Sequence, residues 1–408
     1  MINPLKGMKD LTFEDSQRFI YVVTTAIGIA KRYGYGYIET PILEETALFV
    51  RSVGESSDIV GKEMYHFIDK AKEDKEPKDI CLRPEGTAGV VRSFVSAKLD
   101  RQQTKQKFYY YGSMFRRERP QKGRYRQFHQ FGCESFGESS VYEDFTIITM
   151  ISQIFEALNV GFELQINSLG CKTCMPPYKT NLVNFLTSIK EELCSDCNRR
   201  IDTNPIRVLD CKNSRCQELL KASPKLLQNL CEECENDFTK LQTLLDNANI
   251  AYKVDTNLVR GLDYYNKTAF EFVSNDIGAQ SAIAGGGRYD KLVEFLDGKP
   301  TPAVGFAIGI ERIMELVKMP LLEREGIYMG AMVKEGVEPL FEIARKKRLS
   351  TKVTLEYKHK GFKSHLKGAD KVNAKYIVLV GEDELKNGTL WVKNLETKEE
   401  KSVLVGEF

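Results

Sequence analysis

The chain has 408 residues, enough for two or three domains of ordinary size. It carries 59 Lys and Arg against 57 Asp and Glu, so its net charge of +2 gives no overall field that would attract nucleic acid or an acidic membrane. Apolar residues make up 42% and aromatic residues 10%, which excludes a disordered chain. No apolar run approaches the roughly 20 residues that cross a bilayer, and the polar start is unlike a signal peptide. We therefore expect a soluble, cytosolic protein with no membrane partner.

The first elements in chain order are a helix and a short strand. Apolar residues between Phe19 and Ala30 recur at helical spacing, behind a candidate cap at Asp15 or Ser16. Residues 37–40 then predict a short strand that Pro41 ends.

A long antiparallel hairpin follows. Residues 107–115 and 127–136 alternate in character as strands do. Between them, residues 116–126 contain six Lys or Arg and one acid, with Pro120 and Gly123 at the turn. By itself this tip is more typical of a solvated, charged hairpin than of a binding site.

Eight of the ten cysteines lie in one segment of mostly helical spacing, which we expect to be an inserted subdomain at residues 171–240. They form four pairs, of which three have the C-x-x-C spacing that suits a tetrahedral zinc site: Cys171/Cys174, Cys194/Cys197, Cys211/Cys216 and Cys231/Cys234. Two structural four-cysteine zinc sites are the simplest hypothesis. Reduced thiols in a helical subdomain are the alternative, which Cys231 and Cys234 fit best. Disulfides are disfavoured because the sequence shows no secretion signal. A catalytic zinc is also disfavoured, because the segment contains no histidine.

The rest of the chain returns to strands and then alternates strands with helices. A helix is expected at 143–158, and strands at 161–166, 251–254, 268–273 and 303–308. From residue 324 the alternation predicts a small α/β domain with a mostly parallel sheet. We therefore expect a core in two parts, at 1–170 and 241–323. An insertion at 171–240 separates these parts, and a C-terminal domain follows at 324–408.

Polar residues stand beside glycines in four further segments, at 82–89, 259–265, 284–290 and 304–312. Arg260 and Arg312 belong to two of these segments, and Arg116 to the hairpin tip. Guanidinium groups bind phosphate with two parallel hydrogen bonds. Arginines from three separated segments therefore indicate a phosphate site more strongly than any one segment does.

Six motifs together resemble one family over nearly the whole chain. The hairpin, MFRRERPQKGRYRQFHQFGCE, resembles motif 2 of class II aminoacyl-tRNA synthetases in its histidyl version. The segments YGYIETPILEE and AVGFAIGIERI resemble motifs 1 and 3. Three others resemble signatures of histidyl-tRNA synthetases: LRPEGTAGVVR, LVRGLDYYNKTAFEF and AGGGRYD.

The resemblance implies a class II catalytic domain on an antiparallel sheet, a helical cysteine-rich insertion and an α/β anticodon-binding domain. It implies that ATP, with Mg²⁺, activates L-histidine to histidyl-adenylate before transfer to tRNA(His), in a homodimer joined through motif 1. The catalytic residues it implies are Arg260 and Arg116. The ATP-binding residues are Arg116, Glu118, Arg124 and Arg312. The histidine-binding residues are Glu85, Gly86, Thr87, Gln130, Glu134, Arg260, Tyr264 and Tyr265.

A local basic stretch indicates RNA contact independently of the family. Residues 345–375 include eleven Lys or Arg against two acids, a local excess of +9 in a nearly neutral chain. A solvated helix face is the alternative. We expect tRNA-binding residues at Arg345, Lys346, Lys347, Arg348, Lys358, Lys360 and Lys363.

Two other functions remain to be weighed. One is a non-catalytic regulatory subunit of histidine biosynthesis that shares the synthetase fold; such a protein is expected to lose the nucleotide-binding arginines and the C-terminal domain. The other is a zinc-dependent nucleic-acid binding module, which leaves the arginine motifs unexplained. Histidine-dependent pyrophosphate exchange separates the synthetase from both.

Overall fold

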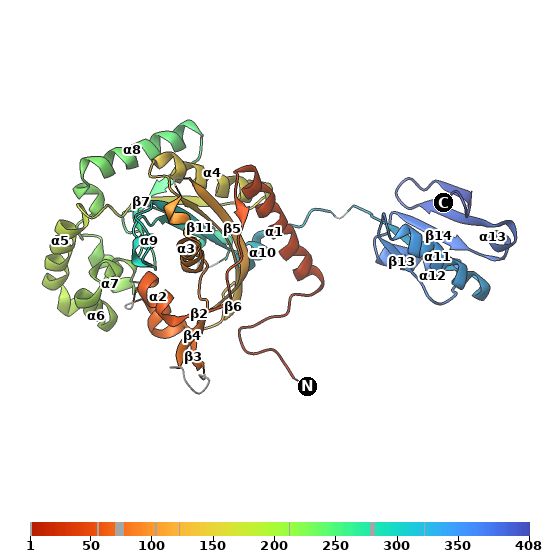
Figure 1. Cartoon of the computed structure of the whole chain (residues 1–408), viewed down its shortest axis with the longest axis horizontal. Helices are drawn as coiled ribbons and strands as arrows, with labels where there is room; N and C mark the ends of the chain where they lie inside the picture. The colour runs from red at the N-terminus through yellow and green to blue at the C-terminus, as the bar shows by residue number, and fades with distance from the viewer. Residues whose placement is uncertain are drawn as a thin grey trace. The chain divides into compact units, whose positions relative to one another are not determined.

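The chain forms two compact units, Met1–Lys318 and Met319–Phe408, in the computed structural model (Figure 1). The structure describes residues 2–54, 57–69, 77–102, 104–121, 123–211, 213–277, 282–321 and 323–408. Lys122, at the predicted hairpin tip, lies outside these ranges. Among the described residues, no helix has the length and apolar character needed to span a membrane.

An eight-stranded sheet organises the larger unit. All neighbouring strands are antiparallel except the two edge pairs, which confirms the predicted antiparallel core. In spatial order the strands are β1 (Gly36–Tyr37), β5 (Gln106–Phe115), β6 (Gln127–Phe136), β11 (Ala303–Gly309), β10 (Ala282–Arg288), β9 (Asn266–Val273), β7 (Glu163–Ser168) and β8 (Tyr252–Val254).

The predicted hairpin is confirmed as β5 and β6. The two strands pair without interruption from Gln106 opposite Phe136 to Phe115 opposite Gln127. The strand expected at 37–40 is shorter, since only Gly36 and Tyr37 pair with β5. The tip of the hairpin therefore extends from the long central strands, where its arginines can meet residues of β9, β10 and β11.

Helices cover both faces of this sheet. Apolar residues of α1 (Phe13–Arg32), α4 (Val141–Ala157), α8 (Glu232–Asn247) and α10 (Ile310–Leu316) form a core with one face. The cap of α1 is Thr12, so Asp15 and Ser16 lie within its first turn rather than before it.

The other face packs against a second core from smaller elements. They include a three-stranded sheet of β2 (Leu43–Glu45), β4 (Lys78–Leu82) and β3 (Tyr65–Asp69). The helices are α2 (Thr46–Val53), α3 (Thr87–Ser96) and α9 (Leu292–Phe295), with short turns at Ile59–Glu63 and Leu99–Arg101. The turn at Asn275–Ile277 belongs to the first core, where Ile277 packs.

The cysteine-rich insertion is helical, as predicted. Its helices are α5 (Met175–Ser188), α6 (Ser195–Thr203) and α7 (Ser214–Leu220), joined by the turns η3 (Lys190–Glu192), η4 (Pro205–Asp210) and η5 (Leu226–Asn229). The following helix α8 continues to Asn247, past the expected boundary at 240, because Leu241 and Leu245 are buried in the core of the main sheet.

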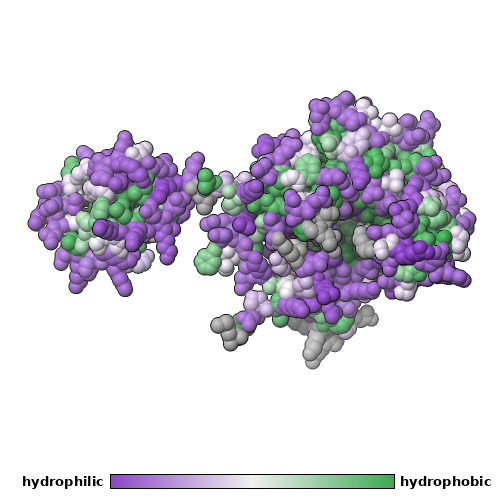
Figure 2. Space-filling view, turned by 180° about the vertical axis from the view of Figure 1, so that it is seen from behind, coloured by the Kyte–Doolittle hydropathy of each residue, from purple (hydrophilic) through white to green (hydrophobic). Residues whose placement is uncertain are grey.

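The C-terminal unit has a mixed sheet in the order β13 (Val353–Leu355), β12 (Ile327–Ala331), β14 (Tyr376–Val380), β15 (Thr389–Asn394) and β16 (Glu400–Leu404). Its helices are α11 (Val337–Lys347), α12 (Phe362–Lys371) and α13 (Glu382–Asn387), with a turn at Lys334–Gly336. The expected α/β layers are present, and hydrophilic residues cover most of the visible face (Figure 2). The prediction of a mostly parallel sheet was wrong: β12 is parallel to β13 and β14, whereas β15 and β16 add two antiparallel pairings.

Candidate functional site

Four arginines from three separate segments line one cavity above the main sheet. Arg116 and Arg124 come from the hairpin tip, Arg260 from the loop between β8 and β9, and Arg312 from α10. The expected convergence of distant arginines is therefore confirmed. The other predicted residues that line this cavity are Glu85, Thr87, Glu118, Gln130, Tyr264 and Tyr265.

Arg116 and Arg124 are held at the hairpin tip by the carboxylate of Glu118. Arg116 Nε donates to the carbonyl of Pro84 at 2.9 Å, and its guanidinium lies 5.2 Å from the centre of the Phe128 ring. Glu118 forms an ion pair with Arg124 and lies 3.8 Å from Arg116 Nη1. Burial lowers the pKa of Arg116, an effect that nearby Glu63 and Glu85 oppose. The tip thus presents two guanidinium groups to the cavity in a fixed orientation.

Arg260 is fixed by an acid on β9. Its Nη1 donates to Glu271 Oε1 at 2.7 Å, and its guanidinium lies 5.6 Å from the centre of the Tyr265 ring. Burial lowers the pKa of Arg260, but the charge of Glu271 and the neighbouring tyrosines raise it overall. A Cβ atom at Gly285 would lie 2.4 Å from this guanidinium, so only glycine leaves room for it.

Arg312 connects motif 3 to the hairpin tip. Its Nε donates to the carbonyl of Gly123 at 3.4 Å, and its Nη1 donates to the carbonyl of Ala282. Burial lowers the pKa of Arg312, and the positive charges of Arg124 and Arg116 lower it further. These guanidinium groups therefore repel one another, and an anion in the cavity would relieve that repulsion.

Three buried side-chain polar atoms of cavity-lining residues have neither a hydrogen-bond nor an ion-pair partner within the part of the chain that the structure describes. They are Gln130 Oε1, Arg260 Nε and Tyr264 OH. An unsatisfied buried polar group costs about 1–3 kcal/mol, so native proteins rarely retain one without a reason. A polar ligand in the cavity would supply partners for these atoms.

The start of α3 shapes the cavity wall. Glu85 is buried, and its carboxylate accepts hydrogen bonds from the backbone N–H groups of Thr87 at 2.7 Å and Ala88 at 2.8 Å. Burial raises the pKa of Glu85, while these two N–H groups oppose the rise. The acid therefore also caps α3 and fixes its first turn against the cavity.

Glu134 lies beneath the cavity and does not line it. It is fully buried, and it accepts hydrogen bonds from Thr87 Oγ1 at 2.7 Å, Tyr110 OH at 3.2 Å and Tyr289 OH. Burial raises its pKa to about 8, although these hydroxyl groups oppose the rise. A Cβ atom at Gly305 would overlap its carboxylate, which explains the glycine in β11.

Gly86 also stays outside the cavity lining. A Cβ atom there would lie 2.1 Å from the Tyr110 ring, so the glycine accommodates a tyrosine rather than a ligand. The glycine-rich segment 284–290 has a mixed role. Gly285 faces Arg260, whereas Arg288 forms a buried ion pair with Asp144 of α4.

Sequence reasoning missed three side chains that organise the site. Glu271 lines the cavity and pairs with Arg260, and its signal was a single acid in the apolar strand β9. Tyr110 and Tyr289 hold Glu134. Tyr289 lies in the AGGGRYD segment, whereas nothing in the local sequence of Tyr110 distinguishes it from a core tyrosine. Beside the cavity, His129 Nδ1 lies 2.7 Å from Oε1 of Glu311, a cavity-lining residue of α10.

The eight clustered cysteines form two groups of four. One group joins Cys171 and Cys174 to Cys231 and Cys234, and in each group the sulfur atoms lie within 4.8 Å of one another. The second group is Cys194, Cys197, Cys211 and Cys216. Cys231 and Cys234 therefore face other cysteines instead of forming an isolated helical pair. Both groups lie in the insertion, outside the arginine cavity.

The predicted tRNA-binding residues of the C-terminal unit fall into two groups. Arg345, Lys346, Lys347 and Arg348 lie at the end of α11, and Arg348 donates to the carbonyl of Val353 at the start of β13. Lys358, Lys360 and Lys363 lie beyond the other end of the parallel strands, where the N–H of Lys360 donates to the carbonyl of Ala331. The stretch that is basic in sequence is thus divided between two edges of the sheet.

Comparisons with known proteins cover the whole chain. The profile of histidyl-tRNA synthetase matches residues 7–172 and 191–313, and that of an anticodon binding domain matches 333–408. A histidine–tRNA ligase of Sulfurovum sp. (strain NBC37-1) is 74% identical over 407 residues, with 100% of each chain covered. One of Sulfurimonas denitrificans is 62% identical over 404 residues, with 99% of each chain covered.

A solved structure agrees with these relatives. The crystal structure of apo S. aureus histidyl-tRNA synthetase has a TM-score of 0.81 and 32% identity, and the match covers 100% of this chain and 98% of that one. The chain therefore belongs to the histidyl-tRNA synthetase family, as its sequence motifs, its arginine-lined cavity and its full-length relatives all indicate.

Proposed function

We propose that the chain is a histidine–tRNA ligase, which activates L-histidine with ATP and transfers it to the 3′ end of tRNA(His). The observation that carries this proposal is the convergence of Arg116, Arg124, Arg260 and Arg312 on one cavity. Relatives up to 74% identical over the full chain bear this name and support the same activity.

ATP occupies the arginine side of the cavity. Arg116 contacts the α-phosphate, while Arg124 and Arg312 bind the outer phosphates, and Glu118 keeps the two hairpin guanidinium groups in place. Mg²⁺ enters with the triphosphate, which supplies most of its oxygen ligands. Glu118 and Glu271 are the cavity carboxylates nearest to these arginines, so they are the protein oxygens suited to hold it.

Histidine occupies the side of the cavity that α3 and β6 form. Gln130 offers a buried amide oxygen that lacks a partner, and Glu85 and Thr87 offer oxygens for the α-amino group. Tyr264 and Tyr265 pack together in the wall, with their ring centres 4.6 Å apart. Glu134, directly beneath Thr87, sets the polarity of this end and selects a ring that carries N–H groups.

The first chemical step is a displacement at the α-phosphorus. A histidine carboxylate oxygen forms the new bond to phosphorus as the bond to the bridging oxygen breaks, and pyrophosphate leaves with that electron pair. Arg260 stands beside Glu271 with its Nε free to donate to the charge that develops. Its contribution is therefore electrostatic stabilisation and orientation, as expected where no covalent help from the protein is needed.

The tRNA contacts the C-terminal unit through its carboxyl-edge basic group, Lys358, Lys360 and Lys363. Tyr357 and Phe341 are exposed beside this group, with stacked rings 5.6 Å apart. Exposed aromatic rings beside cations suit unstacked bases of single-stranded RNA. The amino-edge group, Arg345 to Arg348, adds a general attraction to phosphate.

A homodimer in the cytoplasm fits the same proposal. Apolar side chains of the motif 1 region and its neighbours are exposed in the single chain, among them Tyr37, Ile42, Leu43 and Ile68. Contiguous exposed apolar residues are typical of subunit interfaces. All ten cysteines are free of disulfides, as expected in a reducing compartment.

The regulatory-subunit alternative is disfavoured by the same residues. Such a protein does not need the four arginines, Glu271 or the C-terminal unit, all of which this chain keeps. Pyrophosphate exchange into ATP tests the proposal, with histidine as the variable amino acid. We expect exchange with histidine alone, followed by charging of tRNA(His); no histidine-dependent exchange would contradict the proposal.

A further inference from the structure

We propose that the insertion binds two zinc ions, each through four cysteine thiolates, and that the metals hold the loop that carries Arg260. The first site is Cys171, Cys174, Cys231 and Cys234, and the second is Cys194, Cys197, Cys211 and Cys216. Zinc binding does not depend on the proposed enzymatic activity. Only the effect on Arg260 rests on the proposed function.

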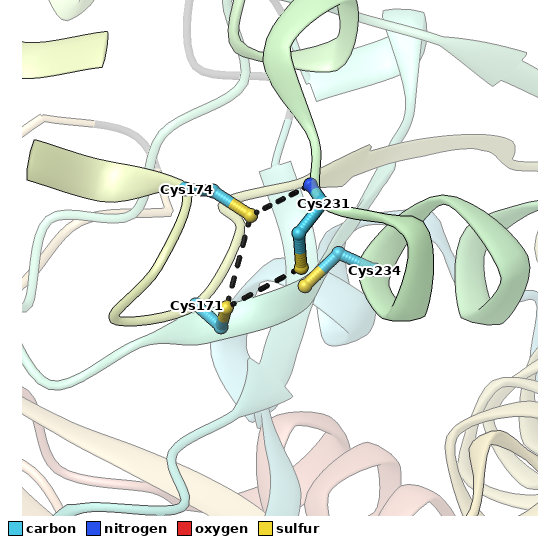
Figure 3. Close-up of side chains that lie close together, drawn as sticks. All are labelled: Cys171, Cys174, Cys231 and Cys234. Atoms are coloured by element: carbon cyan, nitrogen blue, oxygen red, sulfur yellow. Dashed lines mark hydrogen bonds between the residues drawn. The ribbon is translucent and has the colours of Figure 1, made fainter. Parts of the chain in front are cut away.

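The sulfur–sulfur distances fit a metal centre and not a disulfide. Cys171 Sγ lies 3.7 Å from both Cys174 Sγ and Cys231 Sγ, and Cys194 Sγ lies 3.8 Å from Cys211 Sγ. A tetrahedral zinc with bonds of about 2.3 Å sets its sulfur ligands about 3.8 Å apart. A disulfide would bring two of them to about 2.05 Å. Figure 3 shows the four side chains of the first site turned toward a common centre.

Backbone N–H groups point at these sulfur atoms, as expected for thiolates. Cys231 N donates to Cys174 Sγ at 3.1 Å, and Thr173 N donates to Cys171 Sγ at 3.3 Å. In the second site Cys194 N donates to Cys216 Sγ at 3.3 Å. Such second-layer hydrogen bonds stabilise negative charge on metal-bound sulfur. Both sites therefore contain the donor set and the surroundings of a closed structural zinc.

The first site closes the insertion at its root. Cys171 follows β7 closely, and Cys231 caps α8, so one metal would join the two ends of the inserted segment. Gly170 adopts a φ of +61° beside this site, and a Cβ there would lie 2.8 Å from Cys174. The sharp turn into the site thus requires glycine.

The second site fixes the part of the insertion that touches the Arg260 loop. Cys197 lies in α6 and Cys211 directly follows η4, and Arg207 of η4 lies between them in sequence. Arg207 Nε donates to Asp263 Oδ1 at 2.9 Å, and its Nη2 donates to the carbonyl of Gly261 at 2.8 Å. Asn204 Nδ2 also donates to Asp263, at 3.1 Å. Arg207 is therefore a positioning residue for Arg260.

Metal content of the full-length enzyme tests the proposal. Protein purified without chelators should contain two zinc ions per chain by elemental mass spectrometry. Titration with a mercurial reagent should release both ions as eight thiols react. Replacement of zinc by cobalt(II) should give the visible absorption of tetrahedral thiolate coordination. A folded enzyme with less than half a zinc per chain, and with eight thiols that react without metal release, would overturn the proposal.

Single substitutions assign the two sites. Cys234→Ser and Cys197→Ser should each lower the zinc content to one ion per chain, whereas Cys81→Ser, at a buried cysteine outside both groups, should keep two. If a variant does not fold, the mercurial titration of the wild type still counts the thiols released with each ion. Two ions retained in both folded variants would contradict the assignment.

The link to Arg260 needs a separate variant. Arg207→Met should keep both zinc ions but lower the kcat of pyrophosphate exchange about tenfold, with little change in KM for ATP. Arg207→Lys should restore part of the rate, and Arg199→Met, at an exposed arginine of α6, should behave as wild type. An unchanged kcat in Arg207→Met would refute the link and leave the zinc sites standing.

Discussion

The cavity of the larger unit and the basic stretch of the C-terminal unit both concentrate cations, but in opposite ways. In the cavity, four arginines from three distant segments converge and are partly buried. In the C-terminal unit, residues close in sequence are divided between two edges of a sheet, and most are exposed. The contrast shows that charge density along the chain does not predict charge density in space.

The difference has a physical origin in the two folds. The long hairpin of β5 and β6 and the antiparallel sheet bring remote residues together, and glycines such as Gly285 leave space for side chains among them. In the C-terminal unit α11 and α12 each run from one edge of the parallel strands to the other, so the basic run that spans them is divided between the two edges. Because the cavity arginines are partly buried, salt screens their contacts with a ligand only weakly. The basic residues of the C-terminal unit are mostly exposed, so salt should weaken their contacts with phosphate.

The largest expected effect comes from Arg260. Arg260→Gln removes a donor to the charge that develops on the α-phosphate, so pyrophosphate exchange should fall on the order of 10²–10³-fold. Binding of tRNA should persist. Arg51→Gln, at an exposed arginine paired with Asp297, is the matched control and should keep the wild-type rate. Near-normal exchange in Arg260→Gln would remove this residue from the mechanism.

The second effect tests the space beside that arginine. Gly285→Ala places a methyl group against the guanidinium and should displace it, at a cost on the order of 10²-fold or less in kcat. Gly28→Ala, at a glycine of α1 whose added Cβ would meet nothing within 4 Å, is the control. Equal exchange rates in the two variants would show that Arg260 does not need its present position.

The third effect separates the two basic groups. Lys358→Glu with Lys363→Glu should raise KM for tRNA by about tenfold, and the increase should shrink at high salt. Arg345→Glu with Lys346→Glu changes the charge equally at the other edge and should have a smaller effect. Pyrophosphate exchange, which needs no tRNA, should stay unchanged in both. A larger effect at the amino edge would reverse our assignment.

The smallest effect concerns Glu134 and pH. Its folded-state pKa of about 8 lies above the ordinary value of 4.5, so its contribution to stability is complete below about pH 4.5 and is lost as the pH rises through 8. Glu134→Gln cannot titrate. The free energy of unfolding of the wild type, relative to this variant, should therefore fall by up to about 1.4 kcal/mol per pH unit within that window. Parallel urea-unfolding profiles would contradict the shift.

Local patterns predicted the elements, and long-range contacts decided the site. Alternation along 107–115 and 127–136 located the hairpin, and the family motifs located the cavity arginines. The depth of Glu134 was not predictable, because it depends on Tyr110 and Tyr289 from other strands and loops.

The same limit applied elsewhere in the chain. The spacing of the cysteines indicated zinc, but only the structure showed which cysteines form each group of four. Cys171 and Cys231, for example, belong to one group although they lie 60 residues apart in the sequence. In the C-terminal unit, sequence reasoning missed the antiparallel strands β15 and β16, although Leu390 and Val392 of β15 are buried alternately as in a strand with one face in the core.

Binding of ATP to Arg116→Gln, Arg312→Gln and the double variant, measured by calorimetry, tests the convergence of these arginines most directly. Each single variant should weaken binding at least tenfold. The double variant should depart from the sum of the singles by about 0.5 kcal/mol or more, because both groups act on one triphosphate. Wild-type affinity in either single variant, or strict additivity, would contradict a shared nucleotide site.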